Sequence, residues 1–273
     1  MCNKKVDNII NKTKFKKEVQ KYPDCYRVIR KIYYNIKETI YRLNSNNYFV
    51  ITDKRKVTFF LPHKGDYIQQ IIIVQKSFYE LTYLRMIEKY IDCTSIVIDI
   101  GSNIGNHAVY FGRIIEVKKM YLFEPCSDVF NVLRKNIYLN KLNSKTELYN
   151  FALGSKNSKA KINLDGKKYK NLGLTSIKES DIGDIKIKKL DDIDIIENKV
   201  DLIKIDVEGF EIEVLKGALV SIQKYRPIIW IETFKDKYKY VVEIFESISY
   251  VLLEALGDEN YIFAPAENTY DIL

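Results

Sequence analysis

The sequence has few of the residues that build disulfide frameworks and zinc sites. It contains four cysteines and two histidines in 273 residues. No two cysteines form a CxxC pair, and none stands near a cluster of histidines. We therefore expect neither a disulfide-stabilised fold nor a zinc finger, and the cysteine usage fits a reducing compartment.

Long hydrophobic runs are also absent. The longest, residues 71–74, falls far short of the ~18 apolar residues that a membrane-spanning helix needs. The first residues, MCNKK, lack the apolar core of a signal peptide. Apolar residues nevertheless make up 47% of the chain, which is enough for a packed core. We therefore expect a globular, cytoplasmic protein.

Charge is unevenly distributed along the chain. Residues 1–45 hold twelve Lys/Arg against four acids, a surplus equal to the net charge of +8 of the whole chain. The simpler interpretation of this segment is a solvated helix face. The sharper one is peripheral contact with an anionic membrane or a phosphorylated glycan carrier. Nucleic acid is less favoured, because the rest of the chain adds no net attraction for it.

Apolar spacing predicts a small N-terminal region before the main domain. Residues 13–43 have helical periodicity, and the runs 48–52, 57–61 and 68–74 read as a small β element. Residues 77–80 have the S-x-x-E form of a capping box, which predicts a helix start. We assign residues 1–75 to a basic segment and residues 76–273 to the main domain.

From residue 96 onward, strand and helix patterns alternate. We predict strands at 96–100, 120–124, 147–153, 200–206, 227–233, 250–256 and 261–264, and helices at 103–115, 127–140, 211–224 and 238–249. This alternation favours a parallel sheet with helices on both faces. The last two strands follow each other closely and predict an antiparallel hairpin. Residues 154–199 read as an insertion, a candidate acceptor-binding region.

A glycine-rich turn follows the first of these strands, in the run from Asp99 to Gly105, D-I-G-S-N-I-G. Gly101 lets the backbone approach a ligand closely, and Asn103 tolerates a left-handed conformation. The following helix start offers free N–H groups to a carboxylate or phosphate. The dinucleotide pattern G-x-G-x-x-G is absent, and Asp99 suits a ligand that carries an amino group beside its carboxylate. A purely structural strand–helix turn would use the same glycines.

A second acid ends the next strand. Glu124 precedes Pro125 and follows Asp99 by 25 residues, near the ~20-residue offset at which an acid reaches a ribose diol. An acid here could instead cap the next helix. Because ligands of such sheets bind outside the carboxyl ends of the strands, both motifs predict one nucleoside crevice.

A third group of charges lies on the strand at 200–206 and its neighbour. Lys204 and Asp206 alternate along a buried strand and so share a face, where a lysine is costly unless paired. Glu208 follows that strand, and Glu232 ends the strand at 227–233. Three carboxylates and a lysine at adjacent strand ends indicate acid–base or metal chemistry, although Lys204 and Asp206 could form a structural ion pair alone.

Taken together, these motifs resemble the FkbM-type S-adenosylmethionine-dependent methyltransferases, over roughly residues 70–256. The resemblance rests on V-I-D-I-G-S-N-I-G, F-E-P, A-L-G at 152–154 and D-L-I-K-I-D-V-E-G-F-E…L-K-G-A. It implies an α/β, Rossmann-like class I fold. This would have a mostly parallel seven-stranded sheet with an antiparallel C-terminal hairpin. The N-terminal helical and β extension predicted from the apolar spacing lies outside the resemblance. It also implies O-methylation of a sugar hydroxyl in a surface glycan or of a small metabolite.

The resemblance also implies roles for single residues. The methionine end of S-adenosyl-L-methionine would contact Asp99, Gly101, Ser102, Asn103 and Gly105. The ribose would contact Glu124 and Pro125. The adenine would contact Phe151 and Ala152. Asp206 would border both cofactor and acceptor, with Glu208 on the acceptor side.

For catalysis, Asp206 is our first choice of base, Glu208 and Glu232 are its rivals, and Lys204 would orient or neutralise it. Mg²⁺ held by these three carboxylates is an option that we favour less than a metal-free site.

Two other function classes stay open. One is an RNA or protein methyltransferase that uses the basic N-terminal arm. The other is a non-catalytic nucleotide-binding module on the same scaffold. The sequence indicates no oligomeric state.

Overall fold

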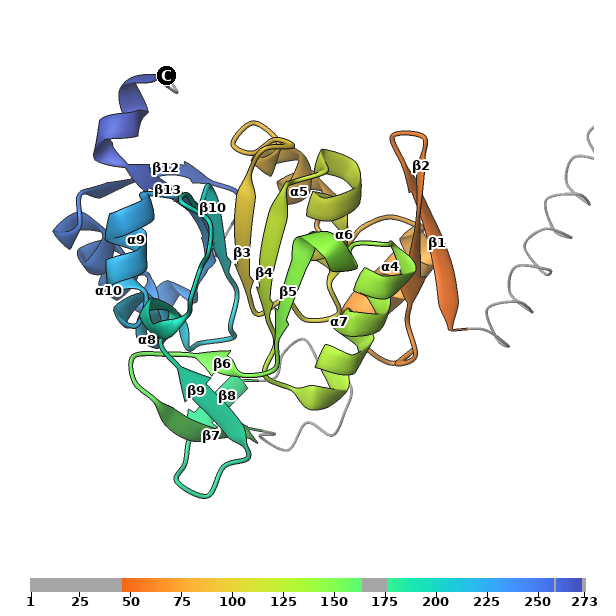
Figure 1. Ribbon diagram of the computed structural model, residues 1–273, viewed down its shortest axis with the longest axis horizontal. Helices are drawn as coiled ribbons and strands as arrows, with labels where there is room; N and C mark the ends of the chain where they lie inside the picture. The colour runs from red at the N-terminus through yellow and green to blue at the C-terminus, as the bar shows by residue number, and fades with distance from the viewer. Residues whose placement is uncertain (1–45, 164–175, 258, 272–273) are drawn as a thin grey trace, which may run out of the picture. The chain divides into compact units, whose positions relative to one another are not determined.

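The computed structural model describes residues 46–163, 176–257 and 259–271 (Figure 1). Contacts divide the chain into Met1–Tyr48 and Phe49–Leu273. The helix predicted over residues 13–43 lies outside the described residues, and the assignment of residues 1–75 as a separate segment stays a prediction. None of the helices in the described part is long and apolar enough to cross a bilayer.

A seven-stranded sheet forms the centre of the second unit. Its strand order is β12-β13-β11-β10-β3-β4-β5. The strands are β3 (Ile96–Ile100), β4 (Lys119–Phe123), β5 (Thr146–Tyr149), β10 (Leu202–Ile205), β11 (Ile228–Glu232), β12 (Tyr250–Ala255) and β13 (Asn260–Pro265). β13 pairs antiparallel with both β11 and β12, and the other pairs are parallel. The predicted α/β class I fold with a reversed C-terminal hairpin is confirmed.

Helices cover both faces of this sheet, which explains why all five residues of β3 are buried. On one side lie α8 (Glu211–Lys216), α9 (Leu219–Tyr225) and α10 (Lys235–Ser247), and on the other α5 (Leu81–Ile87), α6 (Asn106–Tyr110) and α7 (Ser127–Leu139) (Figure 1). Alternate strand residues therefore face different helices. Ile98 and Ile203 pack in one core with Val214 and Phe245, on the side of α8 and α10.

Two predicted helices are interrupted. The one predicted at 103–115 begins at Asn106 and passes into a π-helical turn at Phe111–Ile115. The one predicted at 211–224 divides into α8 and α9, because Gly217 lies against the carbonyl of Gly154 and the chain must turn there. Short 3₁₀ helices occupy Asn143–Lys145, Leu190–Asp192 and Ala266–Asp271.

Two predictions before residue 96 are wrong. Residues 68–74 form helix α4 (Tyr67–Gln75), not a strand, because Asp66 caps the start by accepting a hydrogen bond from the Gln69 amide at 3.0 Å. The helix predicted after residues 77–80 is present as α5, with Leu84 and Ile87 buried, but the capping box itself is absent. α5 begins only after Glu80, which is left-handed and makes no side-chain cap. The other two extended runs are confirmed as β1 (Asn47–Thr52) and β2 (Arg55–Phe60).

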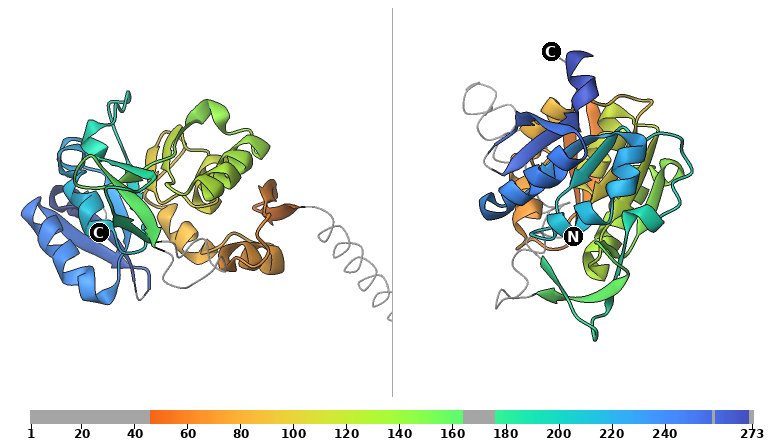
Figure 2. Two further views of the ribbon diagram at one scale, coloured as in Figure 1. Left: turned by 90° about the horizontal axis from the view of Figure 1, so that it is seen from below. Right: turned by 90° about the vertical axis from the view of Figure 1, so that its left-hand side faces the viewer.

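The strand predicted at 147–153 belongs to two sheets. β5 ends at Tyr149, and β6 (Ala152–Leu153) joins a second sheet of order β6-β9-β7-β8. The break lies at Asn150, whose side-chain amide donates to the Glu124 carbonyl at 2.9 Å and turns the chain. The other strands of this insertion sheet are β7 (Ser158–Asn163), β8 (Ser176–Glu179) and β9 (Ile185–Lys188). It lies below the large sheet in Figure 1 and again in the right-hand view of Figure 2.

Candidate active site

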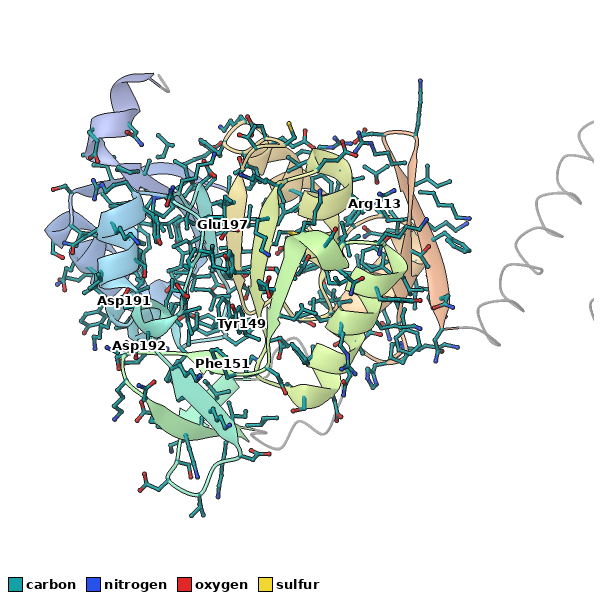
Figure 3. The ribbon with its side chains drawn as sticks, viewed as in Figure 1. Arg113, Tyr149, Phe151, Asp191, Asp192 and Glu197 are labelled. Carbon is teal, nitrogen blue, oxygen red and sulfur yellow. The ribbon has the colours of Figure 1, made fainter. Side chains whose placement is uncertain are left out.

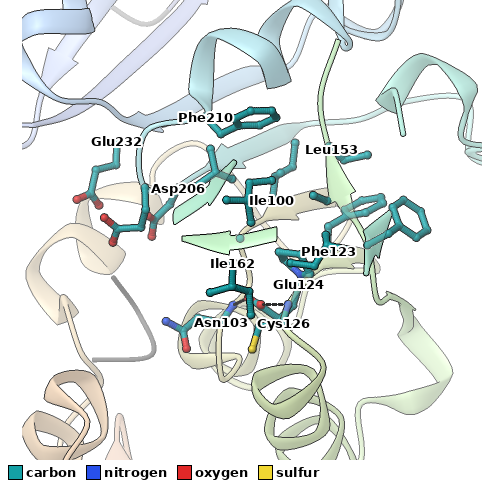
Figure 4. Close-up of a pocket in the computed structure, with 18 of the residues that line it drawn as sticks. Ile100, Asn103, Phe123, Glu124, Cys126, Leu153, Ile162, Asp206, Phe210 and Glu232 are labelled. Carbon is teal, nitrogen blue, oxygen red and sulfur yellow. Dashed lines mark hydrogen bonds between the residues drawn. The ribbon is translucent and has the colours of Figure 1, made fainter. Parts of the chain in front are cut away.

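A cavity of about 380 Å³ lies at the carboxyl ends of β3, β4, β10 and β11 (Figure 4). Nine of the residues predicted from the sequence line it, namely Gly101, Asn103, Glu124, Pro125, Phe151, Ala152, Asp206, Glu208 and Glu232. They come from loops far apart in the chain, and the parallel order of the strands brings them together. A single crevice was expected here for this reason.

Four predicted residues do not line the cavity. Asp99 and Lys204 are buried beneath it as partners on the adjacent strands β3 and β10. The Ser102 hydroxyl donates to the Asp99 carbonyl at 2.8 Å and so holds the turn from within. Gly105 is left-handed at the start of α6, where an added Cβ would lie 2.7 Å from the Leu133 side chain.

The turn after β3 has the predicted conformation. Gly101 has a φ of +83° and Asn103 a φ of +49°, both left-handed. The Gly101 amide donates to the Phe123 carbonyl at 2.9 Å, which ties the turn to β4. The Asn103 side-chain oxygen accepts from the Ile104 amide at 2.7 Å. Gly101 therefore lines the cavity with backbone atoms alone.

Glu124 is held in place by backbone amides. One carboxylate oxygen accepts from the Asn103 amide at 3.0 Å and the other from the Cys126 amide at 2.8 Å (Figure 4). Burial raises the pKa of Glu124 to about 7, although these two amides act in the opposite direction. The same bonds join the turn after β3 to the turn after β4.

Asp206 stands above a buried ion-pair chain. The Lys204 Nζ lies 3.0 Å from an Asp206 oxygen and 3.7 Å from Asp99 Oδ1. Burial alone would lower the pKa of Lys204, but the carboxylates of Asp206 and Asp99 outweigh it and hold the pKa above its usual value. The Asp206 side chain keeps 25% of its surface exposed, so its carboxylate remains open to the cavity.

The other two carboxylates differ from Asp206 in having no cation bonded to them in the described part of the chain. Burial raises the pKa of Glu208 to about 8, with Asp206 and Glu211 adding to it. Burial also raises the pKa of Glu232 to about 8, with Asp206 and Glu80 contributing. Both groups therefore keep a proton near neutral pH and can donate a hydrogen bond.

Tyr79 and Glu80 belong to this end of the cavity, although the sequence patterns did not assign them. Tyr79 lines the cavity, and burial with the nearby charges of Glu80 and Glu232 raises the pKa of its phenol. The Glu80 carboxylate lies 3.1 Å from His107 Nε2, and the His107 ring meets Trp230 edge-on with ring centroids 5.2 Å apart. The available signal in the sequence was the run F-Y-E at residues 78–80, which also fits the FkbM-type resemblance.

The opposite end of the cavity is apolar. Phe123 contacts both Tyr149 and Phe151, with ring centroids 4.7 and 5.7 Å apart. Figure 3 labels Tyr149 and Phe151. The insertion sheet adds Ile162, Ile177 and Ile185, which sequence reasoning missed (Figure 4). Their signal was the alternation of isoleucine or alanine with lysine in the runs 159–162 and 185–188.

Metal binding finds no ready-made site in the part of the chain that the structure describes. No group of three or more His, Cys, Asp or Glu is arranged there to hold an ion. The preference for a metal-free site stays a prediction that needs its own test.

Comparison with known proteins now adds a family. A model described as the methyltransferase FkbM domain matches residues 99–259, more than half of the chain. Methyltransferase sdnD of Sordaria araneosa is 29% identical over 154 residues, covering 45% of this chain and 60% of that protein. Hexuronic acid methyltransferase AglP of Haloferax volcanii is 27% identical over 154 residues, covering 55% and 61%. The chain thus spans about 60% of the length of these curated relatives.

Solved structures are more distant in sequence. Methyltransferase FkbM from Methylobacillus flagellatus KT superposes with a TM-score of 0.45 at 15% identity, covering 72% of this chain and 52% of that one. M. jannaschii TYW2 in complex with AdoMet superposes with a TM-score of 0.41 at 12% identity, covering 80% and 84%.

Proposed function

The chain belongs to the methyltransferase FkbM domain family, and on that premise we propose that it methylates a hydroxyl group with S-adenosylmethionine as donor. The acceptor that we propose is a sugar in a surface glycan or a small metabolite. We further propose that the reaction takes place in the cytoplasm. The observation that carries the proposal is the meeting of Glu124, Gly101 and Asp206 around one cavity.

The residues present fit the donor. Gly101 leaves a cradle without a side chain, Glu124 offers a buried carboxylate to a diol, and Phe151 and Ala152 offer an apolar surface to a purine. When bound, the donor supplies a methyl group that its sulfonium already activates. The protein then needs to orient the acceptor and manage one proton.

Asp206 is the residue we propose for that proton. It is the carboxylate that Lys204 contacts directly, whereas the raised pKa values of Glu208 and Glu232 leave those groups protonated near neutral pH. Asp206 would accept the proton of the acceptor hydroxyl, which is typically worth ~10²–10⁴-fold in rate. Glu208 and Glu232 would donate hydrogen bonds to neighbouring acceptor oxygens.

The insertion, predicted from the sequence to be an acceptor-binding region, contributes side chains to the cavity. Ile162, Ile177 and Ile185 line the cavity, and they pack in one apolar cluster with Ala152. We therefore propose that Ile162, Ile177 and Ile185 cover the adenine, and that the acceptor approaches from the side of Glu208 and Glu232.

Binding and transfer can be tested separately. Calorimetry with S-adenosylhomocysteine should show binding tighter than that of NAD, and the reverse order would contradict the proposed donor. Labelled S-adenosylmethionine with glycan and metabolite fractions of the source cell should then label an alkali-stable acceptor. Label in RNA or protein alone would contradict the acceptor class. Unchanged rates after chelation would support the metal-free site, and a loss restored by Mg²⁺ would oppose it.

A further inference from the structure

The insertion sheet has two faces of opposite character. Cross-strand pairs set its register: Ile162 lies opposite Ile177, and Ala160 opposite Ile185. Because side chains alternate between faces, these residues and Ile187 share the face that packs inward. All the lysines at the intervening positions are exposed, and we call them the lysine face: Lys159, Lys161, Lys178, Lys186 and Lys188.

Like charges stand directly opposite one another on the lysine face. Lys161 pairs in register with Lys178, and Lys159 pairs with Lys186. Two like charges at opposed positions of an antiparallel pair destabilise the sheet. The repulsion between these opposed lysines therefore destabilises the insertion sheet locally, and binding of an anionic partner would reduce it.

Carboxylates of the insertion do not neutralise the lysine face. Glu179 pairs with Lys156, and Asp181 and Asp184 belong to the turn between β8 and β9. Among the described residues, no carboxylate forms an ion pair with any of the five lysines. Lys188 Nζ lies 4.9 Å from the centre of the Phe151 ring, and the other four lysines direct their charge toward solvent.

We propose that the lysine face docks on an anionic lipid bilayer. It is a row of lysine side chains on a sheet, and each lysine near such a surface adds electrostatic attraction. The other positions of the described β7 and β8 register that fall on it are Asn163 and Ser176, so none of these positions carries an aromatic ring that could stack a nucleobase. A membrane therefore fits better than nucleic acid.

Docking in this way would bring the cavity close to the membrane. The inward face of the same sheet carries Ile162, Ile177 and Ile185, which line the cavity. Only the thickness of one sheet would separate the bilayer from the cavity wall, roughly 10 Å. The inference does not depend on methyl transfer, and its test does not measure it.

The test is sedimentation of the full chain with vesicles of phosphatidylcholine alone and of phosphatidylcholine mixed with phosphatidylglycerol. The wild-type chain should bind the anionic vesicles and release them at raised salt. The double variant Lys161→Glu/Lys178→Glu should bind about ten-fold more weakly or worse. The matched control is Lys135→Glu/Lys141→Glu, which changes the net charge equally at exposed lysines outside the insertion. It should stay within about two-fold of wild type.

Three results would overturn the proposal. They are absence of wild-type binding to anionic vesicles, an equal loss in both double variants, and a preference for polyuridylate over vesicles that the lysine-face variant removes. The basic segment at residues 1–45 is common to all the proteins, so its contribution cancels in the comparison. Thermal unfolding of each variant checks the fold. The lysine-face variant exchanges one pair of opposed like charges for another, so its unfolding midpoint should stay close to that of wild type.

Discussion

Gly101 and Asp206 meet backbone to backbone at the floor of the cavity. A Cβ added to Gly101 would lie 1.8 Å from the Asp206 carbonyl oxygen, and the φ of +83° at Gly101 is left-handed. The Asp206 amide in turn donates to the Ile100 carbonyl at 3.0 Å. The cofactor turn and the proposed base are therefore held by one backbone contact, and displacement of either moves the other.

Gly101→Ala should consequently damage both stability and binding. A methyl group cannot fit against a backbone carbonyl, so we expect a loss of about 3 kcal/mol in the free energy of unfolding. We also expect no detectable affinity for S-adenosylhomocysteine. Denaturant unfolding and calorimetry measure the two effects. Gly65→Ala is the control, because nothing lies within 4 Å of its added Cβ. A stable Gly101→Ala variant that binds normally would disprove the cradle.

Asp206→Asn should separate binding from turnover. The amide keeps the shape of the side chain but is a far weaker proton acceptor, so kcat should fall ~10²–10⁴-fold. The dissociation constant of S-adenosylhomocysteine should change little. Steady-state rates with a labelled acceptor and calorimetry provide the two measurements, with Glu246→Gln on an exposed part of α10 as the control. Full activity of Asp206→Asn would transfer the role of base to Glu208 or Glu232.

Glu232 should make the protein less stable at alkaline pH. Its pKa is about 8 in the folded state against an ordinary 4.5, so the folded state holds a proton that the unfolded state has released between these values. The stabilisation that this proton provides is complete below pH 4.5 and is lost as the pH rises through 8. Glu232→Gln should therefore raise the free energy of unfolding by about 2 kcal/mol at alkaline pH, after allowance for partial solvent exposure.

At pH 5 the same variant should differ little from wild type, because the native carboxyl is then already neutral. Thermal melts across this range measure the difference. An equal effect at both pH values would show that a packing change, and not the charge of Glu232, is responsible.

Ile177→Ala should weaken cofactor binding if the insertion covers the adenine. Removing the buried part of one isoleucine should raise the dissociation constants of S-adenosylhomocysteine and of methylthioadenosine by about ten-fold each. Methylthioadenosine lacks the amino-acid end, so an equal effect on both ligands places the contact at the adenosine. Ile182→Ala is the matched control, because Ile182 lies in the same insertion but is 80% exposed. If Ile177→Ala changes only the KM of the acceptor, the insertion contacts the acceptor and not the adenine.

The sequence by itself determined the order of the main strands and the ends at which chemistry gathers. Two-residue and helical periods are local properties, so the seven strands of the large sheet could be assigned from them, with β5 and β6 read as one strand. The left-handed turn at Gly101 and Asn103 was equally accessible, because it depends on residue type at a fixed strand end. Lys204 and Asp206 were placed on one face for the same reason.

Only the tertiary structure decided which of these residues meet the cavity. Asp99, predicted to contact the cofactor, is fully buried on β3 with its Oδ1 3.7 Å from Lys204 Nζ, and it does not line the cavity. Residues 68–74 are apolar enough for strand or helix, and the Asp66 cap selects the helix. Tyr79 and Ile177 reach the cavity through contacts with segments distant in the sequence, and no local period records such contacts.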